Sequence, residues 1–188
     1  MRKLNFILFI LITSFSTSAL SQNSPVDSKS GIGPRFGYYK APDADEGTMF
    51  LGIQARGRGA IFGGEIAAEY RGEQAYSVTG GELTVRQIPL TGSILVFVPF
   101  TPNFQPYGIA GLGAYYTISD YDGEFVNTET ETKVNVGYHL GFGLDLPINK
   151  SAALNVDYRY LYLDGENDNL EDKQYSGNVI TGGLTFYF

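Results

Sequence analysis

The chain has 188 residues, no cysteine, one histidine and a formal net charge of −7 at pH 7. The lack of cysteine excludes disulfides, thiolate metal sites and a lipidated N-terminal cysteine, and the length suits a single domain. An acidic chain repels nucleic acid and other phosphate-rich surfaces, so we expect no nucleic-acid partner.

The N-terminus has the composition of a secretory signal. Two basic residues precede an apolar run over Leu4–Ile12, and Ala19-Leu20-Ser21 matches a small-x-small cleavage site. The apolar run is too short for a membrane-spanning helix. We therefore expect a signal peptide over 1–21, a short periplasmic segment over 22–31 and one folded domain over 32–188.

Eight segments of the mature chain have the pattern of β-strands. Six of them place apolar residues at every second position, with polar residues or glycine between them, as a strand with one apolar face requires. The segments at 82–98 and 105–117 are apolar or glycine-rich at both parities, so the sequence leaves their faces unassigned. In chain order the expected strands cover 32–39, 49–56, 62–71, 82–98, 105–117, 133–146, 152–163 and 179–188.

The segment Lys133–Leu146 carries the clearest alternation. Its even positions are all apolar, and its odd positions are polar or glycine, among them His139 and Asp145. A usual strand has about 5–6 residues, so this segment is unusually long. It suits a tilted strand across a bilayer, which needs about 9–11 residues plus some overhang.

The connections between the expected strands alternate in length. The long ones are Lys40–Thr48, Gly72–Gly81, Ile118–Thr132 and Asp164–Tyr175, and they hold most of the chain's 20 acidic residues. The short ones are Gly57–Ala60, Pro99–Phe104 and Pro147–Ser151. An even-stranded meander with long loops at one end and short turns at the other is the plan of outer-membrane barrels. We therefore predict an all-β fold, an eight-stranded antiparallel up-and-down transmembrane β-barrel.

Alternation alone does not say which face is outside, because a soluble lipocalin-like barrel with an apolar interior has the same period. Two features favour the membrane. Glycines such as Gly137 lie on the polar face, where they weaken a soluble strand but make room for large neighbours inside a small barrel. Aromatic residues gather near strand ends, with Tyr162 at the loop end and Phe186 at the turn end, as membrane interfaces require.

The final strand, Ile180–Phe188, has apolar residues at every second position and ends in phenylalanine. It resembles the recognition signal of bacterial outer-membrane barrels, and Pro106–Gly113 is similar to a hairpin strand of the small OmpA, OmpX and OmpW-like group. The resemblance covers the mature chain. It implies insertion into the outer membrane of a Gram-negative bacterium by machinery that reads the last strand, with Leu184, Phe186 and Phe188 as the assembly signal. Structural proteins, adhesins and narrow pores all occur in this group.

Charged residues of both signs fall on the polar face of these strands. Eight strands leave an interior just wide enough for side chains to fill, and an unpaired charge there costs several kcal/mol. We therefore expect a lumen plugged by paired charges, with a narrow gated conduit as the alternative. The expected network comprises Arg35, Arg56, Glu65, Glu69, Lys133, His139, Asp145, Asp157 and Arg159, with Arg86 as a further candidate.

His139 is the only histidine and lies mid-strand on the expected lumen face. If the turn at 147–151 is centred on Asn149, His139 lies opposite Arg159, with Asp157 nearby. A lipid-modifying hydrolase would need its serine, histidine and acid at the barrel exterior or rim, whereas His139 points inward with no serine expected beside it. We therefore expect a hydrogen-bonded structural residue and no catalytic or cofactor-binding residue.

The acidic segments Ser119–Glu131 and Asp164–Asp172 carry several carboxylates, which are ligands that calcium takes in proteins. The run that begins at Asp164 lacks the EF-hand order, because no glycine follows the third ligand position. We expect a solvated acidic surface there and no metal site.

These features together predict a structural or surface-interaction protein of the outer membrane, with no catalytic activity and no cofactor. Its expected partners are outer-membrane lipid, the insertion machinery and an extracellular partner at the acidic loops. A narrow pore for small solutes is the first alternative, and a lipid-acting outer-membrane enzyme is the second.

Overall fold

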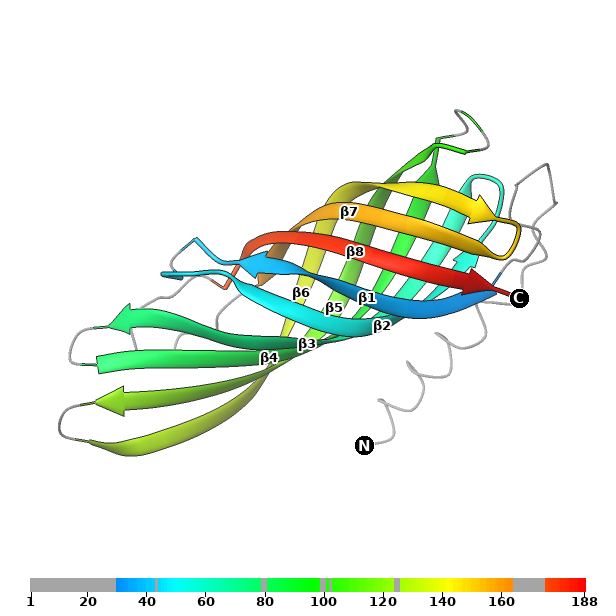
Figure 1. Cartoon of the computed structure of the whole chain (residues 1–188). Coiled ribbons are helices and arrows are strands. Elements are labelled where there is room, and N and C mark those ends of the chain that lie inside the picture. The colour runs from blue at the N-terminus through cyan, green and yellow to red at the C-terminus, as the bar shows by residue number, and fades with distance from the viewer. Residues whose placement is uncertain are drawn as a thin grey trace, which may run out of the picture.

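Eight strands close into one barrel in the computed structural model of the chain (Figure 1). Every strand pairs antiparallel with its neighbours in the chain, and the last returns to pair with the first. The predicted all-β, eight-stranded up-and-down barrel is therefore confirmed. The strands are β1 (Ser30–Lys40), β2 (Thr48–Arg58), β3 (Phe62–Val78), β4 (Gly81–Phe97), β5 (Gln105–Gly123), β6 (Val126–Asn149), β7 (Ala152–Leu163) and β8 (Gly177–Tyr187).

The structure describes residues 30–42, 44–78, 81–98, 101, 103–123, 126–163 and 175–188. The expected signal peptide over 1–21 lies outside this part of the chain, as does nearly all of the expected loop Asp164–Tyr175. Among the described residues, no helix is long and apolar enough to cross a membrane.

The strands turn alternate residues inward and outward, as the sequence pattern requires. In β8, for example, Thr181 and Thr185 are buried and Phe186 is exposed. The structure also assigns the faces of β4 and β5, whose odd-numbered residues point inward, among them Leu95 and Tyr107. These two inner faces are partly apolar, which is why apolar alternation could not identify them.

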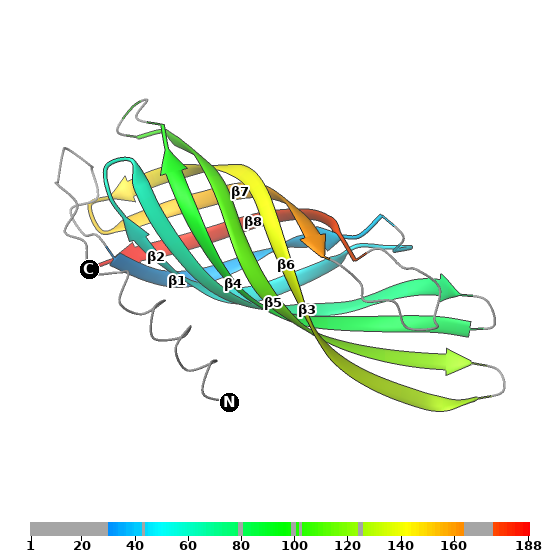
Figure 2. The same ribbon diagram turned by 180° about the vertical axis from the view of Figure 1, so that it is seen from behind.

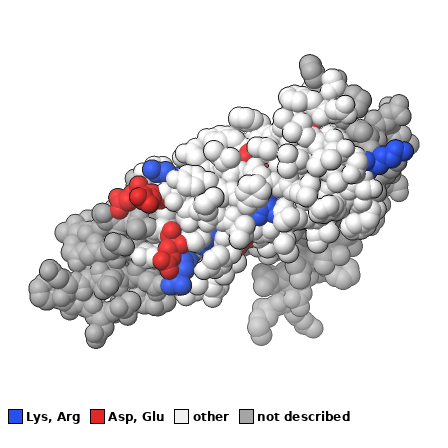
Figure 3. Space-filling model, in the orientation of Figure 1, with Lys and Arg blue, Asp and Glu red and all other residues white. Residues whose placement is uncertain are grey.

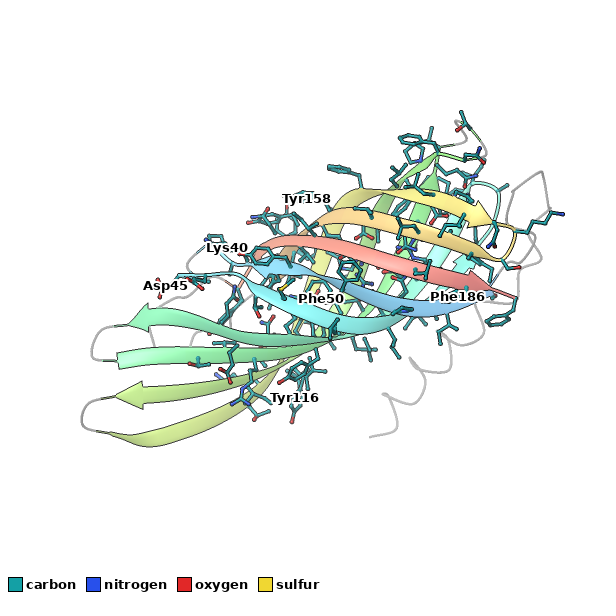
Figure 4. The ribbon with its side chains drawn as sticks, in the orientation of Figure 1. Lys40, Asp45, Phe50, Tyr116, Tyr158 and Phe186 are labelled. Atoms are coloured by element: carbon teal, nitrogen blue, oxygen red, sulfur yellow. The ribbon has the colours of Figure 1, made fainter. Side chains whose placement is uncertain are left out.

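On the face seen in Figure 3, the outer surface of the barrel wall carries few charged side chains. Tyr116 lies at the base of the long hairpins, and Phe186 lies near the opposite end (Figure 4). Tyrosine suits the outer membrane interface because it has an apolar body and a polar tip. We call the end of the barrel with the long hairpins the outer end and the end with the C-terminus the inner end. The exposed tyrosines toward the outer end are Tyr38, Tyr70, Tyr116, Tyr138 and Tyr162, and the exposed phenylalanines toward the inner end are Phe62, Phe104, Phe186 and Phe188.

Four of the strands are much longer than the others. β1, β2, β7 and β8 have 11 or 12 residues, whereas β3, β4, β5 and β6 have 17, 17, 19 and 24. The extra length projects as two hairpins at the end opposite the C-terminus (Figures 1 and 2). We call the parts of β3–β6 that continue outward past Arg71 of β3 and Gly137 of β6 the projecting sheet.

The projecting sheet corrects the prediction of long loops at Gly72–Gly81 and Ile118–Thr132. Most of these residues belong to strands, because β3 ends at Val78 and β6 begins at Val126. Neighbouring strands of the projecting sheet are held by backbone hydrogen bonds, and such bonds do not require an apolar face. Acidic residues and threonine replace the apolar alternation there, so the sequence pattern is lost although the strands continue.

The turn between β6 and β7 is tighter than predicted. β6 runs to Asn149 and β7 starts at Ala152, which leaves Lys150 and Ser151 as the turn. The backbone N–H of Ser151 donates a hydrogen bond to Asn149 Oδ1 at 2.8 Å, as in many tight turns that contain asparagine.

This turn changes which residues face each other across the two strands. His139 pairs with Leu161, and Arg159 pairs with Gly141. The predicted pairing of His139 with Arg159 was therefore wrong by two residues, because the predicted centre of the turn was misplaced by one position.

Candidate functional site

Five arginines and four carboxylates are buried inside the barrel. They come from five of the eight strands, and alternation on each strand turns them inward together. Their charges nearly balance, as buried ions must if their desolvation is to be offset by pairing. The nine residues are Arg35, Arg56, Arg58, Arg71, Arg159, Glu65, Glu69, Asp145 and Asp157.

Glu65 of β3 lies at the centre of this group. Its Oε1 accepts hydrogen bonds from Arg35 Nη1 and Arg159 Nη2, each at 2.8 Å. Its Oε2 lies 2.6 Å from Arg56 Nη2. Charge-assisted hydrogen bonds are stronger than neutral ones, so one carboxylate here ties β3 to β1, β2 and β7 across the lumen.

The ion pairs continue from Glu65 toward the outer end. Arg35 Nη2 lies 3.1 Å from Glu69 Oε1. The second oxygen of Glu69 accepts hydrogen bonds from Arg71 Nη2 at 3.0 Å and from Arg71 Nε at 3.2 Å. Arg71 is therefore the outermost member of the chain of charges.

The ion pairs also continue toward the inner end. Asp157 accepts a hydrogen bond from Arg159 Nε at 2.5 Å and another from Arg56 Nη2 at 3.4 Å. Arg56 Nη1 lies 3.7 Å from Asp145 Oδ1, and Arg58 pairs with the other oxygen of Asp145. We call the whole series from Arg71 to Arg58 the ion chain.

The structure places eight of the nine residues predicted for the lumen network inside the barrel. The ninth, Lys133, is half-buried and pairs in register with Thr117 at the outer mouth. The further candidate Arg86 lies on the other parity of β4, 3.6 Å from Glu73.

Sequence reasoning missed two members of the ion chain. Arg58 was expected in a short turn, and Arg71 stood at the end of its expected strand. Strand parity could have found both, because Arg58 follows Arg56 by two positions and Arg71 follows Glu69 by two. The missing information was how far each strand continues.

An aromatic group surrounds the outermost arginine. The guanidinium carbon of Arg71 lies 4.4 Å from the ring centroid of Tyr39 and 5.6 Å from those of Phe50 and Tyr115. Three strands supply these rings, and we call the three residues the outer cage. Each distance lies within the range of cation–π attraction.

The inner end has a simpler arrangement. The guanidinium carbon of Arg58 lies 4.3 Å from the ring centroid of Phe97. Phe97 packs with Leu95, Tyr107 and Ile109 in an apolar cluster. Apolar residues also pack around the outer cage, including Ala41 and Ala44 from the β1–β2 connection and Leu161. Apolar packing therefore borders the ion chain at both ends.

His139 has a partner that the sequence did not predict. Ser93 Oγ lies 2.9 Å from His139 Nε2, and both side chains are buried. The expectation of no serine beside this histidine was wrong, because the faces of β4 were unassigned. Gly111 separates the two in the sheet, and a Cβ there would lie 2.7 Å from the imidazole ring. The missing side chain thus makes room for the contact.

An uncharged group joins β2, β7 and β8. Gln54 Nε2 donates hydrogen bonds to Asn155 Oδ1 and Thr185 Oγ1, both at 2.9 Å. Asn155 Nδ2 also donates to Thr185 Oγ1 at 3.0 Å. This group adds to the polar filling of the lumen beside the ion chain.

The arrangement places ion pairs and uncharged hydrogen-bonded groups inside the barrel. Across the described residues, no three histidine, cysteine or acidic side chains are placed to hold a metal ion. The acidic segment Asp164–Asp172 and the side chains of Ser119–Glu131 lie outside what the structure describes, so the solvated surface expected there stays a prediction.

Comparison with solved structures shows the same fold in other small barrels. Neisserial surface protein A is 16% identical with a TM-score of 0.58, over 85% of this chain and 97% of that one. OprG from Pseudomonas aeruginosa is 16% identical with a TM-score of 0.59, over 88% and 99%. Ail of Yersinia pestis is 14% identical with a TM-score of 0.52, over 86% and 97%. At such identities the likeness is one of fold.

A comparison with curated proteins gave no match. A family model described as the outer membrane protein beta-barrel domain matches residues 7–188. That match spans every strand of the barrel, and the apolar outer wall agrees with a place in the outer membrane. The chain belongs to the outer-membrane β-barrel domain family.

Proposed function

We propose that this protein is a surface-interaction protein, with the barrel as a sealed anchor and the projecting sheet as the part that binds. The observation that carries the proposal is the unequal length of the strands. β4 and β5 stay paired as far as Gly81 and Gly123, whereas the described pairing of β2 with β3 ends at Phe50 and Arg71. A barrel needs no such extension to cross the membrane, so the extra length supports a role outside it.

The projecting sheet has an edge at β6. Within the part of the chain that the structure describes, β6 pairs with β7 only from Gly137 onward, and from Val126 to Val136 its described strand neighbour is β5. The edge of a sheet can accept an extended segment of another chain as an added strand. Val134 and Val136 are 60% and 71% exposed, and β-branched residues favour such pairing.

Charge narrows the class of partner. The chain has a pI near 4.6, and its acidic residues concentrate in the segments at the outer end. Opposite charge steers association and like charge opposes it, so a basic protein segment is the favoured partner. One structure of Ail holds the heparin analogue sucrose octasulfate. The acidic composition here argues against a sulfated ligand of that kind.

The test shortens one hairpin at a time. Removal of residues 119–131 leaves Ile118 and Thr132, which are a cross-strand pair, to be joined by an Asn-Gly turn. Removal of 75–84 similarly leaves the pair Gln74 and Val85. Each variant is displayed on a host outer membrane, and binding to immobilised basic and acidic peptides is measured.

We expect the intact protein to bind basic peptides and the shortened β5–β6 variant to lose that binding. Heat-modifiable migration on gels should show that both variants still fold as barrels. Equal peptide binding by the intact protein and both shortened proteins would mean that the projecting sheet is not the part that binds.

The pore and the enzyme remain alternatives with less support. A pore would need a path past the ion chain and the apolar packing at its ends. An enzyme would need substrate to reach Ser93 and His139, which are buried inside the barrel. The family is typically non-enzymatic, and we propose no catalytic role for either residue.

A further inference from the structure

The outer cage combines two features that attract organic cations, aromatic rings and a carboxylate. Three aromatic rings face one position, and the Glu69 carboxylate lies against that position through Arg71. Aromatic faces attract cations, and a nearby carboxylate adds charge attraction in a place with little water. This combination recognises guanidinium and ammonium groups.

The chain itself supplies the occupant. All three guanidinium nitrogens of Arg71 have partners, because Nε and Nη2 donate to Glu69 and Nη1 donates to Gln87 Oε1 at 3.4 Å. Arg71 is 3% exposed. Ala41 and Ala44 of the β1–β2 connection pack with the cage rings. The site is therefore enclosed as well as occupied.

We propose that the outer mouth of the barrel is an organic-cation site formed by Tyr39, Phe50, Tyr115 and Glu69, which the chain fills with its own Arg71. A tethered side chain has a high effective concentration, so it excludes dissolved cations of the same class. Arg71 thus acts as an internal ligand that keeps the mouth closed. This inference concerns the barrel mouth and does not depend on the projecting sheet.

The inner end provides a matched comparison. Arg58 also pairs with a carboxylate, Asp145, but among the described residues its guanidinium lies over one ring, that of Phe97. Removing Arg58 vacates a buried arginine without leaving a three-ring cage. Cation binding that is specific to the outer cage should therefore appear when Arg71 is removed and not when Arg58 is removed.

The experiment compares Arg71→Ala with Arg58→Ala and with the intact protein, each folded in detergent. Methylguanidinium is titrated into each sample by calorimetry, and urea serves as an uncharged probe of similar planar shape. We expect Arg71→Ala to bind methylguanidinium at least about tenfold more tightly than the other two proteins, as a desolvated cation–π site allows. Adding Glu69→Gln to Arg71→Ala should abolish most of the gain.

Two results would overturn the inference. One is a folded Arg71→Ala that binds methylguanidinium no more tightly than Arg58→Ala does. The other is that Arg71→Ala binds urea as tightly as methylguanidinium, which would mean that the site recognises planar shape and not charge. If Arg71→Ala refolds poorly, methylguanidinium added during refolding should raise its yield while urea at the same concentration does not. Failure of that rescue would also contradict the proposal.

Discussion

Glu65 shows how much a single residue can matter in a narrow lumen. It holds three arginines from three other strands, at 2.8, 2.8 and 2.6 Å. Neutralising it leaves those guanidinium groups without their shared partner in a place screened from bulk water. We expect Glu65→Gln to lower the free energy of unfolding by about 3–5 kcal/mol, measured by urea titration of barrels folded into lipid vesicles.

Glu73 provides the control for that measurement. It also pairs with an arginine, Arg86, at 3.6 Å, but its side chain is 65% exposed. Exposed ion pairs contribute about 0–1 kcal/mol, so Glu73→Gln should change stability little. Similar losses for Glu65→Gln and Glu73→Gln would mean that the ion chain does not hold the barrel together.

Two glycines on neighbouring strands give a second test at this scale. A Cβ at Gly111 would lie 2.4 Å from the carbonyl oxygen of Gly92 and 2.7 Å from the His139 ring, whereas a Cβ at Gly92 would meet nothing within 4 Å. Gly111→Ala should destabilise the barrel by about 1–3 kcal/mol through overpacking. Gly92→Ala should be neutral or slightly stabilising, because alanine restricts the unfolded chain. A reversed order of stability would contradict the packing described around His139.

At the scale of a strand, β6 tests which face meets lipid. Leu140 is 51% exposed on the outer wall, and its neighbour His139 is buried beside Ser93. Leu140→Arg should cost about 2–4 kcal/mol if that position lies near the bilayer midplane. His139→Gln keeps a polar side chain in the lumen and should cost much less. If arginine at position 140 is well tolerated, the assignment of the lipid and lumen faces of β6 is wrong.

The last strand carries the predicted assembly signal. Phe188 is 80% exposed, and its backbone N–H donates to the Ser30 carbonyl at 2.9 Å, a contact that Phe188→Ala keeps. We expect Phe188→Ala to reduce insertion in cells but to refold normally in detergent. The control is Phe104→Ala, which removes another exposed phenylalanine outside the last strand. Equal surface levels of both variants would mean that Phe188 has no special role in assembly.

Strand patterns predicted much of this architecture. The alternation in β6, β7 and β8 requires one apolar and one polar face, and it correctly predicted that Asp157 and Arg159 point inward. The same rule failed for β4 and β5, because apolar side chains such as Leu95 and Ile94 occupy both faces. The projecting sheet was missed because strands outside the membrane need no apolar alternation.

Contacts between distant strands could not be predicted at all. The pairing of Glu65 with Arg35 depends on barrel closure and on the stagger of the strands, which no local pattern contains. The same holds for Ser93 and His139, which lie two strands apart across Gly111.

For the whole molecule, the central claim is that the barrel is sealed and serves as an anchor. The ion chain runs through the lumen from Arg71 to Arg58, and apolar clusters lie at both of its ends. An eight-stranded barrel also leaves an interior just wide enough for side chains to fill. Ions should therefore find no continuous path through the intact protein.

Single-channel recording in planar bilayers tests this claim most directly. The intact protein is reconstituted at low protein density and recorded over a series of KCl concentrations. We expect no stable conductance steps from intact barrels, and we expect openings only when the ion chain is broken, as in Glu65→Gln. Steady steps from the intact protein that rise in proportion to salt concentration would contradict the account and favour the narrow pore.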